Sequence, residues 1–554
     1  MEFNLAEVFG AVAAANPDRD CIVFGDRRFT FAQTAERARR FARALHEWGL
    51  GAHRERAELA PHESGQSHLG LYMANCNEFL EAMLGAYGAR VAPFNVNYRY
   101  VADELVYLLG NARADAVMYH ARFAPTLAET LAKMPGPMRL IHVDDGSGND
   151  PLPGAVRYEE LLASVSDEPL DVAPSPDDLY VLYTGGTTGM PKAVLWRQHD
   201  IYVNAMGGRT LGTGEPAAGL EEIVERSRLA GPGSMTLAPL MHGAAQWAAF
   251  ISLCGGRPFV MPPTTTHFDP AEALALASRE RVMSLSMVGD AFGRPLADEL
   301  EAGDYDLSGL LALVTGGAAL SAPLKQRFVE LLPQLTILDA GGASESGAQM
   351  IQASSRLQSA TGRFAPNPGA VVVSEDLTRI LSPGDEEIGW LAQQGLIPLG
   401  YLGDPEKTAR TFPVIEGIRH SVPGDRARWH GDGQIELLGR DSVTINSGGE
   451  KIFAEEVEAA IAEHPAVYDV VVTSRPSARW GNEVVALVRL ADGACVDAGS
   501  IMAEAARHIA RYKLPKAIVF CDRLQRSPSG KADYRWAKAQ VVQGTLSRAV
   551  PHPS

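Results

Sequence analysis

Three glycines and three threonines occupy the six consecutive positions 184–189, and a lysine follows at position 192. Glycines let the backbone approach an anion and turn its N–H groups toward it, while threonine hydroxyls and an ammonium add donors. The segment differs from a Walker loop, in which Gly-Lys-Ser/Thr opens a helix, because Pro191 precedes the lysine and 193–196 should continue as a strand. It predicts a phosphate-binding loop, although a glycine-rich hairpin without a ligand is the plain alternative. The residues expected to hold phosphate are Thr184, Gly185, Gly186, Thr187, Thr188, Gly189 and Lys192.

Other side chains suited to phosphate chemistry are scattered through the second half of the chain. Glu345 lies in the Gly/Ser-rich segment 341–346, Asp425 follows a Pro-Gly pair, and Lys531 follows Ser-Gly near the C-terminus. Carboxylates can bind metal ions or accept hydrogen bonds from hydroxyls, and an ammonium can contact an anion. Taken alone, each also fits a plain role: a solvated carboxylate, a turn aspartate or an exposed lysine.

Short apolar segments alternate with helical patterns through the first two thirds of the chain. Such alternation is typical of βαβ units, which form largely parallel sheets covered by helices. Two later segments, 387–399 and 434–438, look like strands of an antiparallel region. The expected fold class is therefore α/β, with a small antiparallel subdomain inside a large N-terminal domain. The other expected strands are 71–73, 91–96, 116–119, 140–143 and 179–183, and the expected helices are 78–87, 270–279 and 324–332.

A second, smaller unit follows position 439. The junction is short and polar, and Gly439 can absorb a change of backbone dihedrals. We therefore expect an N-terminal domain at 1–439, a hinge at 440–442 and a mobile α+β C-terminal domain at 443–554. The expected elements of the small domain are helices at 455–463 and 500–511 and strands at 467–472, 483–490 and 517–521.

The composition excludes several classes of protein. The chain has 554 residues, 46% of them hydrophobic, and a formal net charge of −17, which argues against a general nucleic-acid binder because such a protein needs a basic face. Five widely spaced cysteines without a CxxC pair argue against a disulfide framework and a cysteine-rich zinc site. Because the sequence lacks a signal-peptide pattern and any run of 18 apolar residues, we expect a cytoplasmic protein without a transmembrane segment. Monomer and homodimer both stay open.

The motif segments, in this order, resemble the adenylate-forming superfamily of acyl-CoA synthetases, aryl-CoA ligases, luciferases and peptide-synthetase adenylation domains. The family's phosphate loop reads Tyr-Thr-Ser-Gly-Thr-Thr-Gly-x-Pro-Lys-Gly, and this chain departs from it at Gly185 and Ala193. Segment 341–345 is similar to the family's Tyr-Gly-x-Thr-Glu, with Gly341 in place of the tyrosine that packs on adenine. The resemblance extends over nearly the whole chain, from residue 5 to residue 540.

The resemblance implies a role for each candidate residue. Glu345 would hold Mg²⁺, Asp425 would accept the ribose hydroxyls, and Arg440 would reach the nucleotide. Lys531 and His242 would act beside the acid, although a lone histidine is usually structural. The further ATP-binding residues implied are Gly317, Ala318, Gly341, Gly342, Ala343 and Ser344. The implied CoA-binding residues are Ser447, Gly448, Gly449 and Lys451, and either Asp441 or Ser442 would be the pivot of the hinge.

The implied activity is an ATP-dependent ligation in two halves. A carboxylate would attack the α-phosphorus of MgATP to give acyl-AMP, and coenzyme A would then take the acyl group after the small domain rotates. The phosphate loop together with segments 196–198 and 206–208 is similar to a bacterial branch that acts on fatty acids and steroid side-chain acids. Many residues of the candidate acid-pocket walls are small, so a roomy, mostly apolar pocket is expected; these walls are 206–208, 244–247, 288–290 and 341–343. The alternatives are an acyl-AMP ligase that loads a carrier protein, an aryl-acid CoA ligase, and a non-catalytic nucleotide-binding scaffold. The last is disfavoured because Glu345, Asp425 and Lys531 are all present.

Overall fold

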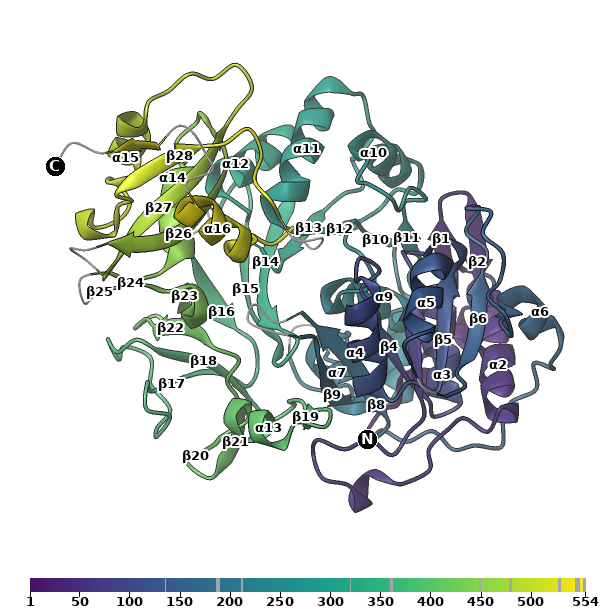
Figure 1. The fold of residues 1–554 in the computed structure, drawn as a ribbon. Helices are drawn as coiled ribbons and strands as arrows, with labels where there is room; N and C mark the ends of the chain where they lie inside the picture. Colours follow the sequence, from purple (N-terminus) through teal and green to yellow (C-terminus); the bar gives the residue numbers. More distant parts are fainter. Residues whose placement is uncertain are drawn as a thin grey trace.

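The chain folds into two sheets with covering helices, an antiparallel extension and a small C-terminal unit (Figure 1). The structure, a computed structural model, describes residues 1–134, 136–185, 190–210, 213–318, 320–358, 362–447, 450–477, 481–526, 530–543 and 549–551. Among these residues, the helices are too short or too polar for any of them to cross a bilayer.

The first sheet carries the glycine- and threonine-rich segment at its antiparallel edge. Six of its strands run parallel, and β9 and β19 add antiparallel neighbours beyond β8. Parallel strands joined through helices are buried on both faces, which explains why β3 and β5 are buried at every residue. In sheet order the strands are β19 (Gly400–Tyr401), β9 (Lys192–Arg197), β8 (Leu179–Thr184), β4 (Ala92–Asn95), β3 (His68–Tyr72), β5 (Ala116–His120), β6 (Arg139–Val143) and β7 (Val156–Arg157).

The second sheet begins as a parallel sheet and continues as an antiparallel one. Its parallel part runs from β1 to β14, and the pairing turns antiparallel where β14 meets β15. The parallel part, with β2 on its edge, comprises β2 (Arg27–Thr30), β1 (Asp20–Phe24), β11 (Phe259–Met261), β10 (Ser234–Thr236), β12 (Ser284–Met287), β13 (Ala312–Gly316) and β14 (Thr336–Ala343). The antiparallel part comprises β15 (Gly347–Ser354), β16 (Arg363–Pro366), β23 (Ile435–Arg440), β22 (Asp425–Trp429), β18 (Gly389–Gln394), β17 (Ala370–Val373), β21 (Ile418–Ser421) and β20 (Val414–Ile415).

Helices cover the parallel strands and pack against them in three apolar clusters. The most enclosed is α3, in which every residue from Asn77 to Tyr87 is buried. Its buried Glu81 is satisfied by Arg37, whose Nε lies 2.9 Å away, and by the Tyr158 hydroxyl at 3.0 Å, as a buried charge requires. The helices are α1 (Leu5–Ala15), α2 (Phe31–Glu47), α3 (Asn77–Gly88), α4 (Ala102–Ala112), α5 (Ala124–Leu131), α6 (Tyr158–Ala163), α7 (Gln198–Ala205), α8 (Leu220–Arg228), α9 (Gly243–Cys254), α10 (Pro270–Arg279), α11 (Gly289–Ala302), α12 (Ala322–Leu331) and α13 (Pro405–Thr411).

The small C-terminal unit has a sheet and an apolar core of its own. It lies beside α11 and α12, in yellow-green at the upper left of Figure 1. Strands β26 and β27 form a long antiparallel pair, and β28 joins β27 in parallel. Its elements are β24 (Ile445–Ser447), β25 (Glu450–Ile452), α14 (Ala454–Ala462), β26 (Val467–Ser477), β27 (Gly481–Leu490), α15 (Ala498–Ala505), β28 (Ala517–Phe520), α16 (Tyr534–Gln543) and β29 (Ala549–Pro551).

The expected fold class is confirmed, and most expected elements are present within a few residues. The helix expected at 500–511 is wrong at its end, because α15 stops at Ala505. Arg507 and His508 bond to the carbonyls three residues back, which tightens the chain into turns. The strand expected at 387–399 is also shorter, since β18 ends at Gln394 and Gly395 then takes a left-handed φ of 81°.

Candidate functional site

The candidate residues of the large domain gather where parallel strands end. Thr184 is the last residue of β8, Gly317 follows β13, and Glu345 lies just after β14. The carboxyl ends of parallel strands are where α/β proteins bind ligands, because loops of variable shape meet there. Chain topology therefore brings together segments that lie far apart in the sequence.

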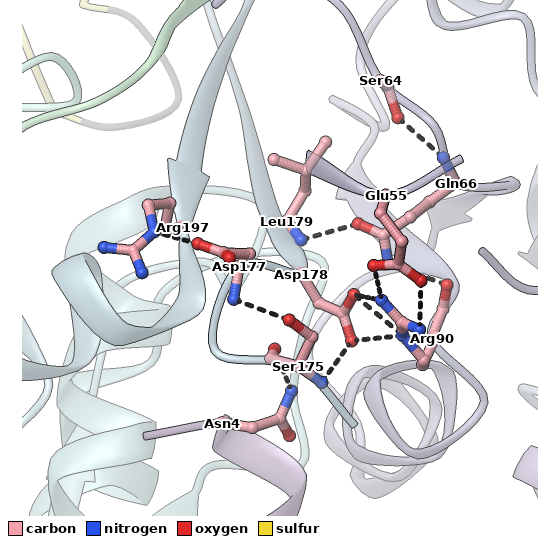
Figure 2. Close-up of polar contacts among 10 residues, drawn as sticks. All are labelled: Asn4, Glu55, Ser64, Gln66, Arg90, Ser175, Asp177, Asp178, Leu179 and Arg197. Carbon is pink, nitrogen blue, oxygen red and sulfur yellow. Dashed lines mark hydrogen bonds and ion pairs between the residues drawn. The ribbon is translucent and has the colours of Figure 1, made fainter. Parts of the chain in front are cut away.

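The hairpin of β8 and β9 is fixed at the end opposite the glycine- and threonine-rich turn. The Leu179 N–H donates to the Gln66 side chain at 2.7 Å, and Arg197 at the end of β9 pairs with Asp177 (Figure 2). Beside them Arg90 forms ion pairs with Asp178 and Glu55, at 2.9 and 2.8 Å (Figure 2). These contacts hold the base of the hairpin, so the turn at its other end projects from a rigid support.

The turn itself is only partly described. Gly186, Thr187, Thr188 and Gly189 lie outside the described residues. Thr184, the last residue of β8, pairs with Lys192, the first residue of β9. The two residues therefore lie at the two ends of the turn. The Lys192 ammonium lies 6.0 Å from the centroid of the Tyr401 ring.

Asn95, which we did not predict, connects this hairpin to the His242 segment. Its amide donates to the carbonyl oxygens of Tyr183 and Met241, at 2.8 and 2.6 Å, and its carbonyl oxygen accepts the Tyr183 N–H at 2.8 Å. A buried amide satisfied on both ends holds its partners in fixed register. Asn95 ends β4, but no motif in the sequence marks it.

Glu345 lies in the turn between β14 and β15 and is oriented by side chains from distant segments. Its carboxylate Oε1 accepts a hydrogen bond of 2.8 Å from the Tyr401 hydroxyl. Its backbone carbonyl accepts from Ser421, and the carbonyl of Ser344 accepts from the Trp196 indole at 2.9 Å. Burial, and then the nearby Glu345 charge, raise the pKa of Tyr401, so the phenol stays protonated and keeps donating.

The two glycines before Glu345 are enclosed for different reasons. A Cβ on Gly341 would lie 2.6 Å from the Met350 methyl group, so the methionine fills the space beside this position. A Cβ on Gly342 would lie 2.1 Å from the Gly347 carbonyl oxygen, across a β-bulge between β14 and β15. Ala343 closes the strand and is buried.

Asp425 and Arg440 face each other across neighbouring strands. The antiparallel register of β22 and β23 pairs these two residues, and the Arg440 Nε lies 3.2 Å from the Asp425 carboxylate. Asp425 first and Glu345 further off raise the pKa of Arg440 against the opposing effect of its burial. The pairing of two neighbouring antiparallel strands therefore brings Asp425 and Arg440 together.

Lys531 comes from the small domain and reaches the site of the large one. A Cβ on Gly317 would lie 3.4 Å from the Lys531 Cε, so the lysine stem passes directly over this glycine, whose φ is 79°. The turn that carries Lys531 is closed by a bridge between Arg526 and Ala532, and Arg526 donates to the Gly530 carbonyl at 3.0 Å. Ser527, Pro528 and Ser529 lie outside the described residues.

The charges around Lys531 explain its electrostatics. Desolvation by the surrounding protein lowers the pKa of the ammonium, and Arg440 lowers it further, while Asp425 and Glu345 act in the opposite direction. The side chain still keeps exposed surface, because it extends across the junction of the two domains and not into a packed core. An ammonium that is enclosed by charges yet accessible is suited to contact a bound anion.

His242 precedes α9 and presents a neutral imidazole to the same region. Its Nε2 is shielded from solvent and has no hydrogen-bond partner among the described residues. Burial lowers the pKa of His242 to about 4, with smaller contributions from Lys531 and Arg99. An unsatisfied buried nitrogen is costly, so this atom is available to a polar group of a bound molecule.

The expected CoA-binding loop lies away from these residues. Ser447 ends β24 and pairs with Glu450, while Gly448 and Gly449 fall outside the described residues. Lys451 lies in β25 opposite Asn446. In Figure 1, β24 and β25 lie on the outer side of the small domain, far from the ends of β12, β13 and β14. The structure thus brings Lys531 to the site, whereas β24 and β25, on either side of Gly448 and Gly449 in the sequence, lie away from it.

A cavity of about 400 Å³ lies near the site, beyond β15. None of the segments expected to form an acid pocket lines it, and the Met206 side chain is fully buried in the core instead. Five of its lining side chains are polar or charged: one arginine, two asparagines and two threonines. The cavity is lined by Asn204, Arg209, Thr210, Thr213, Gly214, Ala348, Asn367 and Pro368.

The donor set suits Mg²⁺ only together with a bound phosphate. In the part of the chain that the structure describes, no group of three or more His, Cys, Asp or Glu side chains is placed to hold a metal ion. Mg²⁺ is usually bound through one or two carboxylates plus substrate phosphates and water, not through a protein cage. The Glu345 carboxylate, held by Tyr401, fits that mode of binding.

Comparisons with known proteins agree with this arrangement. The AMP-binding enzyme family model matches residues 9–396, and the model of the AMP-binding enzyme C-terminal domain matches residues 456–531. The medium-chain acyl-CoA ligase Mig of Mycobacterium avium is 57% identical, covering 98% of this chain and 99% of that protein. A 3-oxocholest-4-en-26-oate–CoA ligase of Rhodococcus rhodochrous is 38% identical over 98% of this chain and 96% of its own. The crystal structure of the anthranilate CoA ligase AuaEII with anthranoyl-AMP has a similar fold, with a TM-score of 0.82 at 20% identity and 98% coverage of both chains.

Proposed function

Because the chain belongs to the AMP-binding enzyme family, we propose that it is an ATP-dependent acyl-CoA ligase that activates a hydrophobic carboxylic acid through acyl-AMP. The observation that supports this most is the position of Lys531, which extends over Gly317 and shares its surroundings with Glu345 and Asp425. The Lys531 ammonium of the small domain thus lies within the electrostatic influence of the Glu345 and Asp425 carboxylates of the large domain. A triphosphate and an acid would react at this place.

In the first half-reaction, the acid's carboxylate oxygen bonds to the α-phosphorus of ATP, and the bond from that phosphorus to pyrophosphate breaks. Thr184 and Lys192, at the two ends of the turn, would hold the β- and γ-phosphates. Asp425 would accept the ribose hydroxyls, and Lys531 would steady the reacting oxygens. Such catalysis consists of positioning and charge stabilisation. Glu345 would hold Mg²⁺, which supplies further positive charge when bound.

In the second half-reaction, the CoA thiolate attacks the acyl carbon and AMP leaves. Lys531 would have to withdraw and the loop at Ser447–Lys451 would have to enter, which requires the small domain, residues 443–554, to rotate on the N-terminal domain, residues 1–439. The pivot would lie at 440–442, where Asp441 pairs with Arg426 at 3.4 Å. The position of Lys531 over Gly317 supports assigning the structure to the first of these two postures, which we call the adenylation posture.

The acid we propose is a fatty acid or a steroid side-chain acid. The support comes from the names of relatives, a medium-chain acyl-CoA ligase at 57% identity and a 3-oxocholest-4-en-26-oate–CoA ligase at 38%. Turnover of short, medium, long, aryl and steroid acids should be compared at equal concentration. Fastest turnover of acetate or of another short polar acid would contradict the proposal.

The test of the activity is acid-dependent exchange of labelled pyrophosphate into ATP, followed by the same assay on Lys531→Ala. Loss of one stabilising donor typically costs about 10²–10³ in rate, so the variant should lose exchange by that factor and still convert supplied acyl-AMP and CoA to thioester. Lys538→Ala, at an exposed lysine of α16, is the matched control and should behave as the wild type. Equal loss of both half-reactions in Lys531→Ala would contradict the assigned role.

A further inference from the structure

Helix α11 lies against the small domain along one face. Its first turn contacts the segment that carries Lys531: a Cβ on Gly530 would lie 3.2 Å from the Val288 carbonyl oxygen and 3.5 Å from the Ala291 Cβ. Gly530 has a φ of 75°, so it both turns the chain and permits this approach. The same end of α11 also carries Asp290. Burial lowers the pKa of Arg526, at the base of the Lys531 turn, but Asp469, then Glu458 and last Asp290 raise it overall.

One helical turn further on, α11 makes a charged contact with the small domain. The Arg294 guanidinium carbon lies 4.7 Å from the centroid of the Tyr468 ring, within the range of a cation–π interaction. Tyr468 belongs to β26 of the small domain, whereas Arg294 belongs to the large one. An ion pair of 3.2 Å with Asp290 holds the guanidinium in place on the helix.

The Tyr468 ring has a second cationic partner that belongs to its own domain. The Arg489 guanidinium carbon lies 4.2 Å from the ring centroid, and Arg489 lies on β27, which pairs with β26. When the small domain moves as a body, the Arg489–Tyr468 contact moves with it unchanged. The Arg294–Tyr468 contact crosses between the domains, so it is made only when the small domain lies where the structure has it.

We propose that Arg294 is a positioning residue that stabilises the adenylation posture, through its cation–π contact with Tyr468, and thereby holds Lys531 at the reacting centre. This inference rests on the proposed function. Arg294 touches no reacting group, because it acts through the small domain that carries Lys531. The second half-reaction requires that contact to break, so removing it should slow acyl-AMP formation and spare thioester formation.

The test compares the two half-reactions in a set of variants. With a medium-chain fatty acid, Arg294→Ala and Tyr468→Ala should each lower pyrophosphate exchange about tenfold, within the range of a partly desolvated cation–π contact. Both should make thioester from supplied acyl-AMP and CoA within about twofold of the wild type. The double variant should lose no more than either single variant, because both remove one interaction.

Conservative variants separate this contact from a general effect on folding. Arg294→Lys keeps a cation and Tyr468→Phe keeps a ring, so both should retain most of the exchange. Arg489→Ala, which removes the contact within the small domain, should exchange at close to the wild-type rate. An equal fall of both half-reactions in Arg294→Ala, or an exchange rate that does not change, would overturn the inference.

A steric variant and a structural readout complete the design. Ala291→Leu should obstruct the approach of Gly530 and lower exchange selectively, without removing any charge. Deuterium uptake by the first turn of α11 and by residues 530–532 should rise in Arg294→Ala, because the docked surface becomes exposed. This readout needs no turnover. If the first turn of α11 is protected from deuterium uptake in the wild type but acid-dependent exchange is absent, the contact is upheld and the proposed function is contradicted. If exchange occurs but α11 is not protected, the contact is contradicted.

Discussion

The Tyr401 hydroxyl donates a hydrogen bond of 2.8 Å to the Glu345 carboxylate, although the two residues are 56 positions apart in the chain. Tyr401 belongs to β19, at the edge of the first sheet, and Glu345 to the turn after β14 of the second. The contact therefore joins the two sheets at the expected metal-binding carboxylate. The same ring faces the ammonium groups of Lys192 and Lys407, at 6.0 and 5.1 Å from its centroid.

Tyr401→Phe should lower acyl-AMP formation and raise the Mg²⁺ concentration needed for half-maximal exchange. The ring would stay, so the contacts to the lysines should survive, but Glu345 would lose the donor that orients it. We expect a loss of about tenfold to a hundredfold, the size of one hydrogen bond to a charged group. Tyr305→Phe, which removes a 2.6 Å hydrogen bond to Glu299 at the far end of α11, is the matched control. A Mg²⁺ dependence identical to that of the wild type would contradict the role given to Tyr401.

Gly439→Ala should impair acyl-AMP formation more than substitution of another glycine that also has a positive φ. Gly439 has a φ of 117°, and a Cβ there would lie 2.4 Å from the Glu455 carboxylate, which also accepts the Arg440 N–H. Gly433 has a φ of 79° with no atom within 4 Å of an added Cβ. Gly433→Ala should cost about 1–2 kcal/mol of stability through backbone strain alone and leave exchange intact.

The comparison isolates the contact at the domain junction. In Gly439→Ala, Glu455 must shift and Arg440 with it, so exchange should fall at least tenfold beyond any loss of stability. Adding Glu455→Ala should restore part of that loss, because it removes the clash while the strain remains. Equal effects of Gly439→Ala and Gly433→Ala on exchange would show that Glu455 does not matter there.

The stability of the protein should depend on His242 between about pH 6.5 and pH 4. The folded-state pKa is lowered to about 4 by burial, Lys531 and Arg99, whereas an unfolded histidine titrates near 6.5. Above pH 6.5 the residue is neutral in both states and contributes no pH dependence. As the pH falls below 6.5 the unfolded state binds a proton that the folded state does not, so stability is lost until the folded pKa is reached.

The measurement is urea unfolding of the wild type and His242→Gln at pH 7.5 and at pH 5. Relative to the wild type, the free energy of unfolding of the variant should increase as the pH falls, by on the order of 1–2 kcal/mol at pH 5. His267→Gln, at an exposed histidine, reports the background effect of the substitution. A difference between wild type and His242→Gln that is the same at both pH values would contradict a buried neutral imidazole.

Features encoded within one short segment were predictable from the sequence. The hairpin of β8 and β9 follows from two apolar strands around a glycine- and threonine-rich turn. Hydrogen bonds between near neighbours in the chain decide its geometry, so local pattern was sufficient. The pairing of Asp425 with Arg440 was not predicted, because only the strand at 434–438 was expected in that region.

Features that depend on long-range packing were not predictable. Asn95 joins Tyr183 to Met241 across three segments, and Tyr401 reaches Glu345 from another sheet, yet neither residue has a motif around it. The end of α15 was wrong for a related reason, since residues beyond Ala505 have helical propensity but form turns instead. Tertiary contacts decide such positions, and propensity is only a weak prior against them.

The two adjacent glycines before Glu345 should differ in their tolerance of a methyl group. Gly341→Ala meets the Met350 side chain, which is flexible and can move at the cost typical of core overpacking, about 1–3 kcal/mol. Gly342→Ala meets the Gly347 backbone carbonyl at 2.1 Å, which cannot move without shifting β15 and the turn that holds Glu345. Chemical unfolding should therefore show a larger loss for Gly342→Ala, and exchange should fall by about a hundredfold or more in that variant alone. Adding Met350→Ala should restore stability to Gly341→Ala but not to Gly342→Ala. Restored stability in both variants would show that the Met350 side chain, and not the β-bulge, makes this strand intolerant of a methyl group.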